Sequence, residues 1–478
     1  MMSNKLTKIR YFFLPLKYRL PVLLLFTLHV SQSKAQGASF WSEPVLLFEE
    51  DGTGEIHGPS IISDSYGNVH VFWSVPSESP GGLDMIYYTR LDAIGWSTPV
   101  DIIAASPARG ATATIGPDDF IYLIWAGAGT TISYSRAPIQ GAEFVKNWSK
   151  PVPITNANFY ADLFTSASGN IYLAYTGVGT SGVFEQSLDL NNQSWSSSRM
   201  ISQTSLTNTA ADYVQMGVSE NGTMHVVWTE FYYPESWPPR GIFYSRSIDE
   251  GNTWSVPKVM AGDGYDQINI AVVDDNNIYV AWNGMAAVGG RYFRWSSDGG
   301  ETWSETIELI PAGVGGTEGY PQLVVDQSGT IHMLTTYAGG CLWYTQLENQ
   351  TWLPPICISG ERTLIEEPSM TVSEGNKLHA VFWDNRKSLW YTTKITNASW
   401  IAPEKIQNDL SQPTQRVAST TTPVIVPTMS PTIEPLVPQS GVSDRFNLNP
   451  AQLLILSLSP VILLILWIVA LIFFKKRK

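Results

Sequence analysis

A strand-like segment recurs seven times in this 478-residue chain, and this repeat constrains the fold more than any other feature. Each copy carries a His or Tyr at the same place, and these markers are 47 to 54 residues apart: His70, Tyr122, Tyr172, His225, Tyr279, His332 and His379. An apolar strand precedes each copy and an aromatic strand follows it. A Trp-led segment, from Trp96 in the first unit to Trp400 in the last, closes each unit. Each period therefore holds four short strands.

Seven four-stranded units are typical of a β-propeller, in which each unit forms one blade. The composition agrees, because 12% aromatic and 15% charged residues favour many short strands. An eighth Trp segment, residues 40–47, precedes the first unit. We expect it to complete or augment the last blade, because an open ring would leave strand edges unpaired. The sequence predicts an all-β propeller over residues 36–406 with seven blades, and six or eight are the alternatives.

The two ends of the chain have the composition of targeting and anchoring segments. Residues 1–35 join a basic stretch to a short apolar run and small residues, which is typical of a secretory signal peptide; an uncleaved anchor is the alternative. Residues 451–474 are apolar and long enough for a transmembrane helix, and the basic tail 475–478 favours the cytoplasmic side. The Pro-, Ser- and Thr-rich residues 407–450 should form a stalk, although residues 436–441 loosely resemble a cell-wall sorting signal.

We therefore expect a single-pass protein of the cell membrane with the propeller outside the cell. Ten of the 29 basic residues lie in the two ends, so the segment between them carries 19 basic against 42 acidic side chains, a formal net charge of −23. Such a body would repel phosphate backbones, which argues against nucleic acid as a partner. The two cysteines, Cys341 and Cys357, flank a predicted hairpin centred on Asn349. A disulfide is expected across it, with two buried thiols as the alternative.

Two turns that lead into Trp segments share the pattern S-x-D-x-G-x-T-W. Their residues are Ser247, Asp249, Gly251, Thr253 and Trp254 in the first turn, and Ser296, Asp298, Gly300, Thr302 and Trp303 in the second. Asp can accept backbone N–H bonds, Gly allows positive φ, and Trp covers the turn. The pattern resembles the Asp-box, or BNR, repeat of the sialidase-type β-propeller superfamily. The resemblance implies that these carboxylates are structural and lie on the face opposite the binding cleft.

A propeller collects its binding loops around one axial mouth, at the entry to the innermost strands and between the second and third strands. Candidate ligand-binding residues in these loops are His57, Arg109, Glu230, Trp237, Arg240, Arg291, Asp384 and Arg386. The aromatic loop 229–240 would suit stacking on sugar rings or anchoring a protein partner, or would pack as a lid on the neighbouring blade. For each candidate, a solvated loop charge or a blade-packing residue is the alternative interpretation.

For an active sialidase, the resemblance implies an arginine cluster, an acid/base carboxylate and a Tyr nucleophile assisted by Glu. The Phe/Tyr-Arg-Ile-Pro segment that usually supplies the first arginine is absent, and His57-Gly58-Pro59 stands in its place. The catalytic candidates are Asp212, Asp266, Glu367, Tyr320 and Glu318.

We therefore expect a membrane-anchored propeller that binds a glycan or a surface protein. An exo-sialidase-like glycoside hydrolase or a lyase of altered specificity is the alternative, and a structural spacer is a third reading. The sequence contains no nucleotide-binding glycine motif and no zinc-ligand spacing, so no cofactor or metal is expected. The acidic loops leave calcium open.

Overall fold

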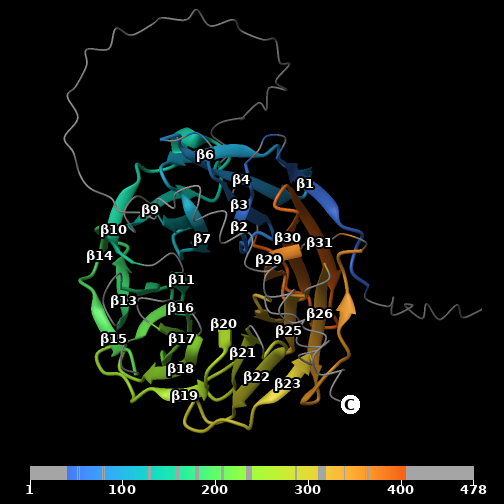
Figure 1. Cartoon of the computed structure of the whole chain (residues 1–478). Coiled ribbons are helices and arrows are strands. Elements are labelled where there is room, and N and C mark those ends of the chain that lie inside the picture. Colours follow the sequence, from blue (N-terminus) through green and yellow to red (C-terminus); the bar gives the residue numbers. More distant parts are fainter. Residues whose placement is uncertain are drawn as a thin grey trace, which may run out of the picture. The chain divides into compact units, whose positions relative to one another are not determined.

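The computed structural model describes residues 40–404, except 51, 53, 78, 80, 127–130, 158–160, 178–181, 206–208, 233–238, 286–287, 311–318, 338–339, 361 and 363–364. The described residues belong to one compact unit. They form seven antiparallel sheets around a central axis (Figure 1), so the predicted seven-bladed β-propeller is confirmed. The predicted signal peptide, stalk, transmembrane helix and basic tail lie outside the described residues. Among residues that are described, no helix is long and apolar enough to cross a membrane.

The blades follow one another in chain order, and each is named here from its innermost strand outwards. Blade 1 contains β2 (His57–Ser63), β3 (Val69–Val75), β4 (Asp84–Asp92) and a split outer strand, β5 (Gly95–Trp96) with β6 (Val100–Ala105). Blade 2 contains β7 (Arg109–Ile115), β8 (Phe120–Ala126), β9 (Thr131–Pro138), the 3₁₀ helix η2 (Val145–Asn147) and β10 (Val152–Asn156). Blade 3 contains β11 (Asp162–Thr165), β12 (Ile171–Thr176), β13 (Gly182–Asp189) and the split β14 (Ser194–Trp195) and β15 (Arg199–Gln203).

The other four blades repeat the same order. Blade 4 contains β16 (Thr209–Val218), β17 (Met224–Tyr232), β18 (Pro239–Ser247) and β19 (Lys258–Ala261). Blade 5 contains β20 (Tyr265–Val272), β21 (Ile278–Gly284), β22 (Arg291–Ser296) and β23 (Ile307–Ile310). Blade 6 contains β24 (Gln322–Val325), β25 (Ile331–Tyr337), β26 (Cys341–Glu348) and the split β27 (Thr351–Trp352) and β28 (Ile356–Cys357). Blade 7 contains β29 (Ile365–Ser373), β30 (Lys377–Asp384), β31 (Ser388–Ile395) and β1 (Val45–Glu49).

The N-terminal strand β1 closes the ring by pairing with β31 as the outermost strand of blade 7 (Figure 1). Just before it, Trp41 packs edge-on against Tyr344 of blade 6, with ring centroids 5.0 Å apart. Trp303 of blade 5 makes the equivalent contact with Tyr244 of blade 4 at 4.9 Å. Trp400 is 60% exposed, so the Trp that closes the last unit is Trp41 and not, as the repeat suggested, Trp400.

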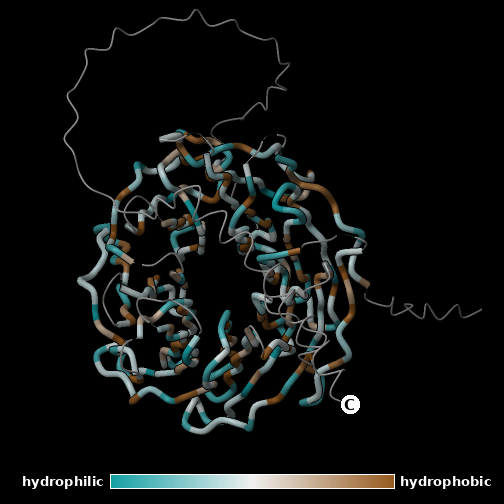
Figure 2. Tube along the Cα trace, in the orientation of Figure 1, coloured by the Kyte–Doolittle hydropathy of each residue, from teal (hydrophilic) through white to brown (hydrophobic). Residues whose placement is uncertain are grey.

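The core is divided into clusters that lie between neighbouring blades, and hydrophobic residues recur around the ring (Figure 2). The second strand of a blade is the most buried; in β3, for example, all seven residues are buried. The marker histidines belong to this core. His70 Nδ1 lies 2.8 Å from the Tyr88 hydroxyl and His225 Nδ1 lies 2.7 Å from that of Tyr244. Burial lowers the pKa of His225 to about 3, so this imidazole is neutral and acts as a packed hydrogen-bonding group.

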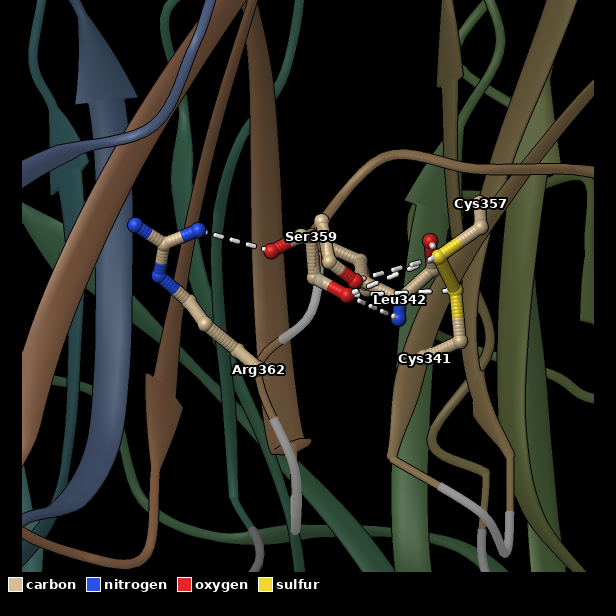
Figure 3. The surroundings of a disulfide bond; sticks show 6 residues. Cys341, Leu342, Cys357, Ser359 and Arg362 are labelled. Atoms are coloured by element: carbon tan, nitrogen blue, oxygen red, sulfur yellow. Dashed lines mark hydrogen bonds between the residues drawn. A yellow bond between two sulfur atoms is a disulfide. The ribbon is translucent and has the colours of Figure 1, made fainter.

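Cys341 at the start of β26 and Cys357 in β28 form a disulfide, with Cα atoms 5.8 Å apart (Figure 3). The strand register places Cys357 opposite Trp343, two residues from the partner that a symmetric hairpin would give it. The reason is that the outer strand is split into β27 and β28, so the pairing shifts between the two pieces. The disulfide therefore fixes the outer edge of blade 6.

Candidate functional site

The inner ends of all seven blades line an axial cavity of about 420 Å³. Each blade contributes the start of its innermost strand, because these starts converge on the axis. The cavity therefore receives side chains from segments as distant in sequence as His57 and Ser369. Its size is within the range of small-molecule binding pockets.

A repeated backbone bulge gives this cavity its shape. The pairing of the innermost strand with the second strand is interrupted in blades 1, 2, 4, 5 and 7. At the bulge, or at the equivalent place in blade 6, one residue has a φ between 37° and 61°: Gly58, Gly110, Tyr213, Gln267, Tyr320 and Glu367. A non-glycine residue pays about 1–2 kcal/mol for this conformation. A bulge redirects side chains, and here it redirects them at the cavity.

A ring of polar side chains lies two residues further along each innermost strand, and we call it the polar belt. Its members are Ser60, Thr112, Asp162, Gln215, Asn269, Gln322 and Ser369. They join neighbouring blades: Asp162 accepts the backbone N–H of Met216 at 2.8 Å, and Asn269 accepts that of Leu323 at 3.0 Å. All of them except Asn269 line the cavity.

Sequence reasoning did not single out the belt residues Gln215 and Gln322, nor Tyr213. A signal for them exists, because every belt residue stands ten positions before the marker His or Tyr of its repeat. That position is polar in all seven copies. Tyr213 stands two residues before Gln215, at the position of the bulge residues with positive φ.

Four of the predicted site residues are brought together in the cavity: His57, Arg109, Tyr320 and Glu367. Burial lowers the pKa of His57, while the nearby Glu367 carboxylate opposes this shift, so the imidazole is neutral at pH 7. Glu367 accepts the backbone N–H of Gly58 at 2.8 Å and the indole N–H of Trp383 at 3.3 Å. Glu367 therefore connects blade 7 to blade 1 at the edge of the cavity.

Asp162, a belt residue, also lines the cavity, and burial raises its pKa to about 6. Asp212 and Asp266, predicted as acid/base residues, do not line it. Burial raises the pKa of Asp212 to about 6 and that of Asp266 to about 7. Each carboxylate precedes the left-handed residue of its blade, which points its own side chain to the cavity. Asp266 is buried and Asp212 is half-buried, and we read this pair as groups of the blades and not of the cavity wall.

Glu230 and Arg291, predicted to bind ligand, are buried inside their blades. Glu230 accepts the backbone N–H of Ser205 at 2.6 Å and the Thr209 hydroxyl at 2.9 Å. Arg291 is 1% exposed. It donates to the Thr335 hydroxyl at 2.7 Å and the Thr336 carbonyl at 2.6 Å. Burial lowers the pKa of Arg291 to about 10. Both charges organise strand ends and are not available at the surface.

The remaining candidates lie outside the cavity or outside the described residues. Arg240 pairs with Asp263 and stacks over the Tyr232 ring at 4.3 Å. Arg386 pairs with Glu55 at 2.9 Å, and Asp384 accepts the Lys387 backbone N–H through its carbonyl. Trp237 and Glu318 are not among the described residues.

Both Asp-box turns fold as hydrogen-bonded loops at the other end of their blades. In the first, Asp249 accepts the Thr253 backbone N–H at 2.8 Å and its hydroxyl at 2.6 Å. Asp298 does the same with Thr302, and these bonds lower the pKa of Asp298 to about 2. Lys258 of blade 4 donates to the Gly300 carbonyl of the second loop at 2.9 Å. Because successive strands run in opposite directions, these turns lie away from the strand starts that line the cavity.

Among the residues that the structure describes, no group of three or more His, Cys, Asp or Glu side chains is arranged to hold a metal ion. The axial cavity presents hydroxyl, amide, carboxylate, imidazole and guanidinium groups.

No protein-family model matches the chain, and no curated protein matches it in sequence. Solved structures do match. The BP39L lectin from Burkholderia pseudomallei is 12% identical, with 75% of this chain and 99% of that chain covered and a TM-score of 0.55. An ulvan lyase, a polysaccharide lyase, is 12% identical, with 73% and 95% covered and a TM-score of 0.51. Trypanosoma rangeli sialidase in complex with the inhibitor DANA is 13% identical, with 74% and 59% covered and a TM-score of 0.41. At these identities the likeness is one of fold alone, and the chain has a seven-bladed β-propeller fold.

Proposed function

We propose that this protein is a carbohydrate-binding propeller whose axial cavity receives a sugar unit of a glycan. The observation that carries the proposal is the composition of the cavity wall. Hydroxyl and amide side chains of the polar belt stand beside Tyr213 and Tyr320 in one cavity of about 420 Å³. Sugars present hydroxyls at their rim and C–H groups on their faces, so they match hydrogen-bonding groups combined with aromatic surfaces.

Two further observations support a role in carbohydrate binding. Two proteins with the same fold are described as a lectin and as a polysaccharide lyase, and the lyase was also solved bound to a saccharide of GlcA and Rha3S. The sequence of the two chain ends predicts an exported protein with a membrane anchor. We propose on this basis that the propeller is displayed at the cell surface, where it meets glycans of other molecules.

Hydrolysis of the sialidase type has less support. That chemistry needs several arginines converging on one carboxylate, and among the described arginines only Arg109 lines the cavity. A lyase is the second candidate, because His57 is neutral and shares the cavity wall with Arg109. In such an elimination His57 would take the proton from the carbon beside the sugar carboxylate, and Arg109 would stabilise the resulting charge. The electron pair would then form a C=C bond as the C–O bond to the glycosidic oxygen breaks, and that oxygen would take a proton from water.

Titration calorimetry of residues 36–406 against glycans selected on an array tests the proposal. We expect Tyr213→Ala and Tyr320→Ala each to weaken binding by about tenfold, because stacking contacts of this kind are worth about 1 kcal/mol or more. Tyr66→Ala is the matched control, since its hydroxyl bonds Asp119 in a turn away from the cavity. If both cavity variants keep full affinity, the glycan does not occupy the cavity. Release of an unsaturated sugar would identify the lyase.

A further inference from the structure

We infer that the ligand of the axial cavity is an acidic sugar whose carboxylate pairs with Arg109. The inference rests on the proposed function and names its ligand class. It comes from a comparison of all the arginines that the structure describes. Only one of them, Arg109, lines the cavity, and among the described residues its terminal nitrogens have no protein partner.

The other described arginines are committed to the protein itself. Arg291 is buried and donates to backbone carbonyls, and Arg240 and Arg386 pair with carboxylates. The remaining six donate to neighbouring carboxylates or carbonyls, mostly near turns: Arg90, Arg136, Arg199, Arg246, Arg294 and Arg362. None of these nine lines the axial cavity.

The guanidinium of Arg109 has a protein partner on its Nε side only. Its Nε lies 3.8 Å from Asp84 Oδ2, and its side chain is 50% exposed. Asp84 is itself fixed, because it accepts the backbone N–H of Ser77 at 2.8 Å and that of Ala108 at 3.0 Å. The buried carboxylate therefore orients the guanidinium through Nε. Among the described residues, no partner is seen for the two terminal nitrogens, Nη1 and Nη2. A planar fork of this kind suits a carboxylate, which can accept two parallel hydrogen bonds.

The cavity wall beside Arg109 differs from the wall formed by the other blades. At the left-handed position, blades 1 and 2 carry Gly58 and Gly110, whereas blades 4 and 6 carry Tyr213 and Tyr320. A Cβ on Gly58 would lie 3.3 Å from the Gly110 Cα, so the two backbones pack closely and neither places a side chain there. One part of the cavity wall therefore carries Arg109, and another part carries the two tyrosines. A sugar ring against the tyrosines would direct its acidic group to Arg109.

The other charged groups of the cavity do not replace Arg109. His57 is neutral at pH 7, and Glu367 already accepts two N–H bonds. Asp162 accepts the Met216 N–H and has a pKa raised to about 6 by burial. These carboxylates disfavour an acidic ligand placed against them. The position beside Arg109 is therefore the one that favours a negative charge.

The test is titration calorimetry of the protein with oligosaccharides that contain glucuronate or galacturonate, each paired with its carboxyl-reduced neutral counterpart. We expect at least one acidic oligosaccharide to bind tenfold or more tightly than its reduced form. Arg109→Gln should lower affinity for the acidic form by 10- to 100-fold, because hydrogen bonds to charged groups contribute about 1.5–3 kcal/mol. The same variant should leave affinity for the reduced form unchanged. The affinity of Arg109→Lys for the acidic form should lie between those of wild type and Arg109→Gln, because lysine keeps the positive charge and loses the planar fork of the guanidinium.

The matched control is Arg294→Gln, which changes an arginine outside the cavity and should leave both affinities unchanged. Asp84→Asn should weaken only the acidic ligand, by less than Arg109→Gln, because it releases the orientation of the guanidinium. If the reduced form binds wild type as tightly as the acidic form, the inference is overturned while carbohydrate binding stands. If neither the acidic nor the reduced sugars bind, and the array also gives no glycan, the proposed function fails with it.

Discussion

Asp266 makes the stability of the propeller depend on pH in a way that a single substitution can isolate. Its side chain is 2% exposed. Burial is the main reason that its pKa rises from an ordinary value of 3.8 to about 7, and the nearby Asp212 carboxylate adds a smaller repulsion. Below pH 3.8 the carboxyl is protonated in both the folded and the unfolded chain. As pH rises from 3.8 to 7, the unfolded chain loses this proton first, so folding stability falls.

The size of the effect follows from the difference between the two pKa values. Each unit corresponds to about 1.4 kcal/mol, so a rise from 3.8 to about 7 removes on the order of 4 kcal/mol of stability once the pH exceeds 7. Asp266→Asn keeps the shape and removes the ionisation. We expect the variant to match wild type at pH 4 and to be more stable by on the order of 4 kcal/mol at pH 8.5.

Urea unfolding of residues 36–406, followed by tryptophan fluorescence at pH values from 4 to 8.5, measures this difference. Asp298→Asn is the contrasting control, because the pKa of Asp298 is lowered to about 2 by the hydroxyl and backbone N–H of Thr302. The stabilisation that the Asp298 carboxylate gives the folded protein is present above its unfolded pKa of 3.8 and is lost as pH falls through 2. Asp298→Asn should therefore be less stable than wild type at neutral pH. If wild type and Asp266→Asn keep a constant difference across the whole range, the explanation by burial is refuted.

Three further predictions concern the ring. Gly58→Ala should cost about 1–2 kcal/mol, because φ is 53° there; thermal unfolding measures it, and an unchanged Tm would contradict the reading of the bulge. Trp41→Ala should cost about 3 kcal/mol through the lost inter-blade packing, whereas Trp400→Ala, at an exposed site, should cost under 0.5 kcal/mol in the same assay. Replacing both Cys341 and Cys357 by Ser should cost about 3 kcal/mol, as expected for a closed loop of 16 residues, and equal urea midpoints would contradict this.

The fold was predictable because the repeat that forms each blade can be recognised in the sequence. One marker, one apolar strand and one Trp segment in each unit define a blade without knowledge of its neighbours. The closing contact was not predictable, because eight Trp segments compete for seven equivalent places. Trp41 and Trp400 have similar local patterns, and only the closed ring, in which β1 pairs with β31, decides which of them packs on blade 6.

The site was predictable in position and only partly in composition. The loop rule selected His57, Arg109, Tyr320 and Glu367, and the structure places all four in the cavity wall, where the innermost strands start. It also selected Asp266, whose neighbour Gln267 has a φ of 51°. In such a bulge, adjacent side chains point to different surroundings, and no sequence pattern marks a left-handed residue that is not glycine. An error of one position therefore exchanges a cavity residue for a buried one.

Two positions of the innermost strand have different roles in the propeller: the polar belt, and the left-handed position two residues before it. The polar belt links neighbouring blades, because its side chains accept N–H groups of the next blade, as Asp162 and Asn269 do. The left-handed position carries four different residue types in the six blades where it is described, from Gly58 to Tyr213 and Glu367, although the backbone conformation is the same. A change at that position alters what the cavity presents without removing an inter-blade bond of the belt. A nearly symmetric ring can thus hold an asymmetric cavity, and the contrast between the glycine side and the tyrosine side would give the sugar that we propose to bind there one orientation.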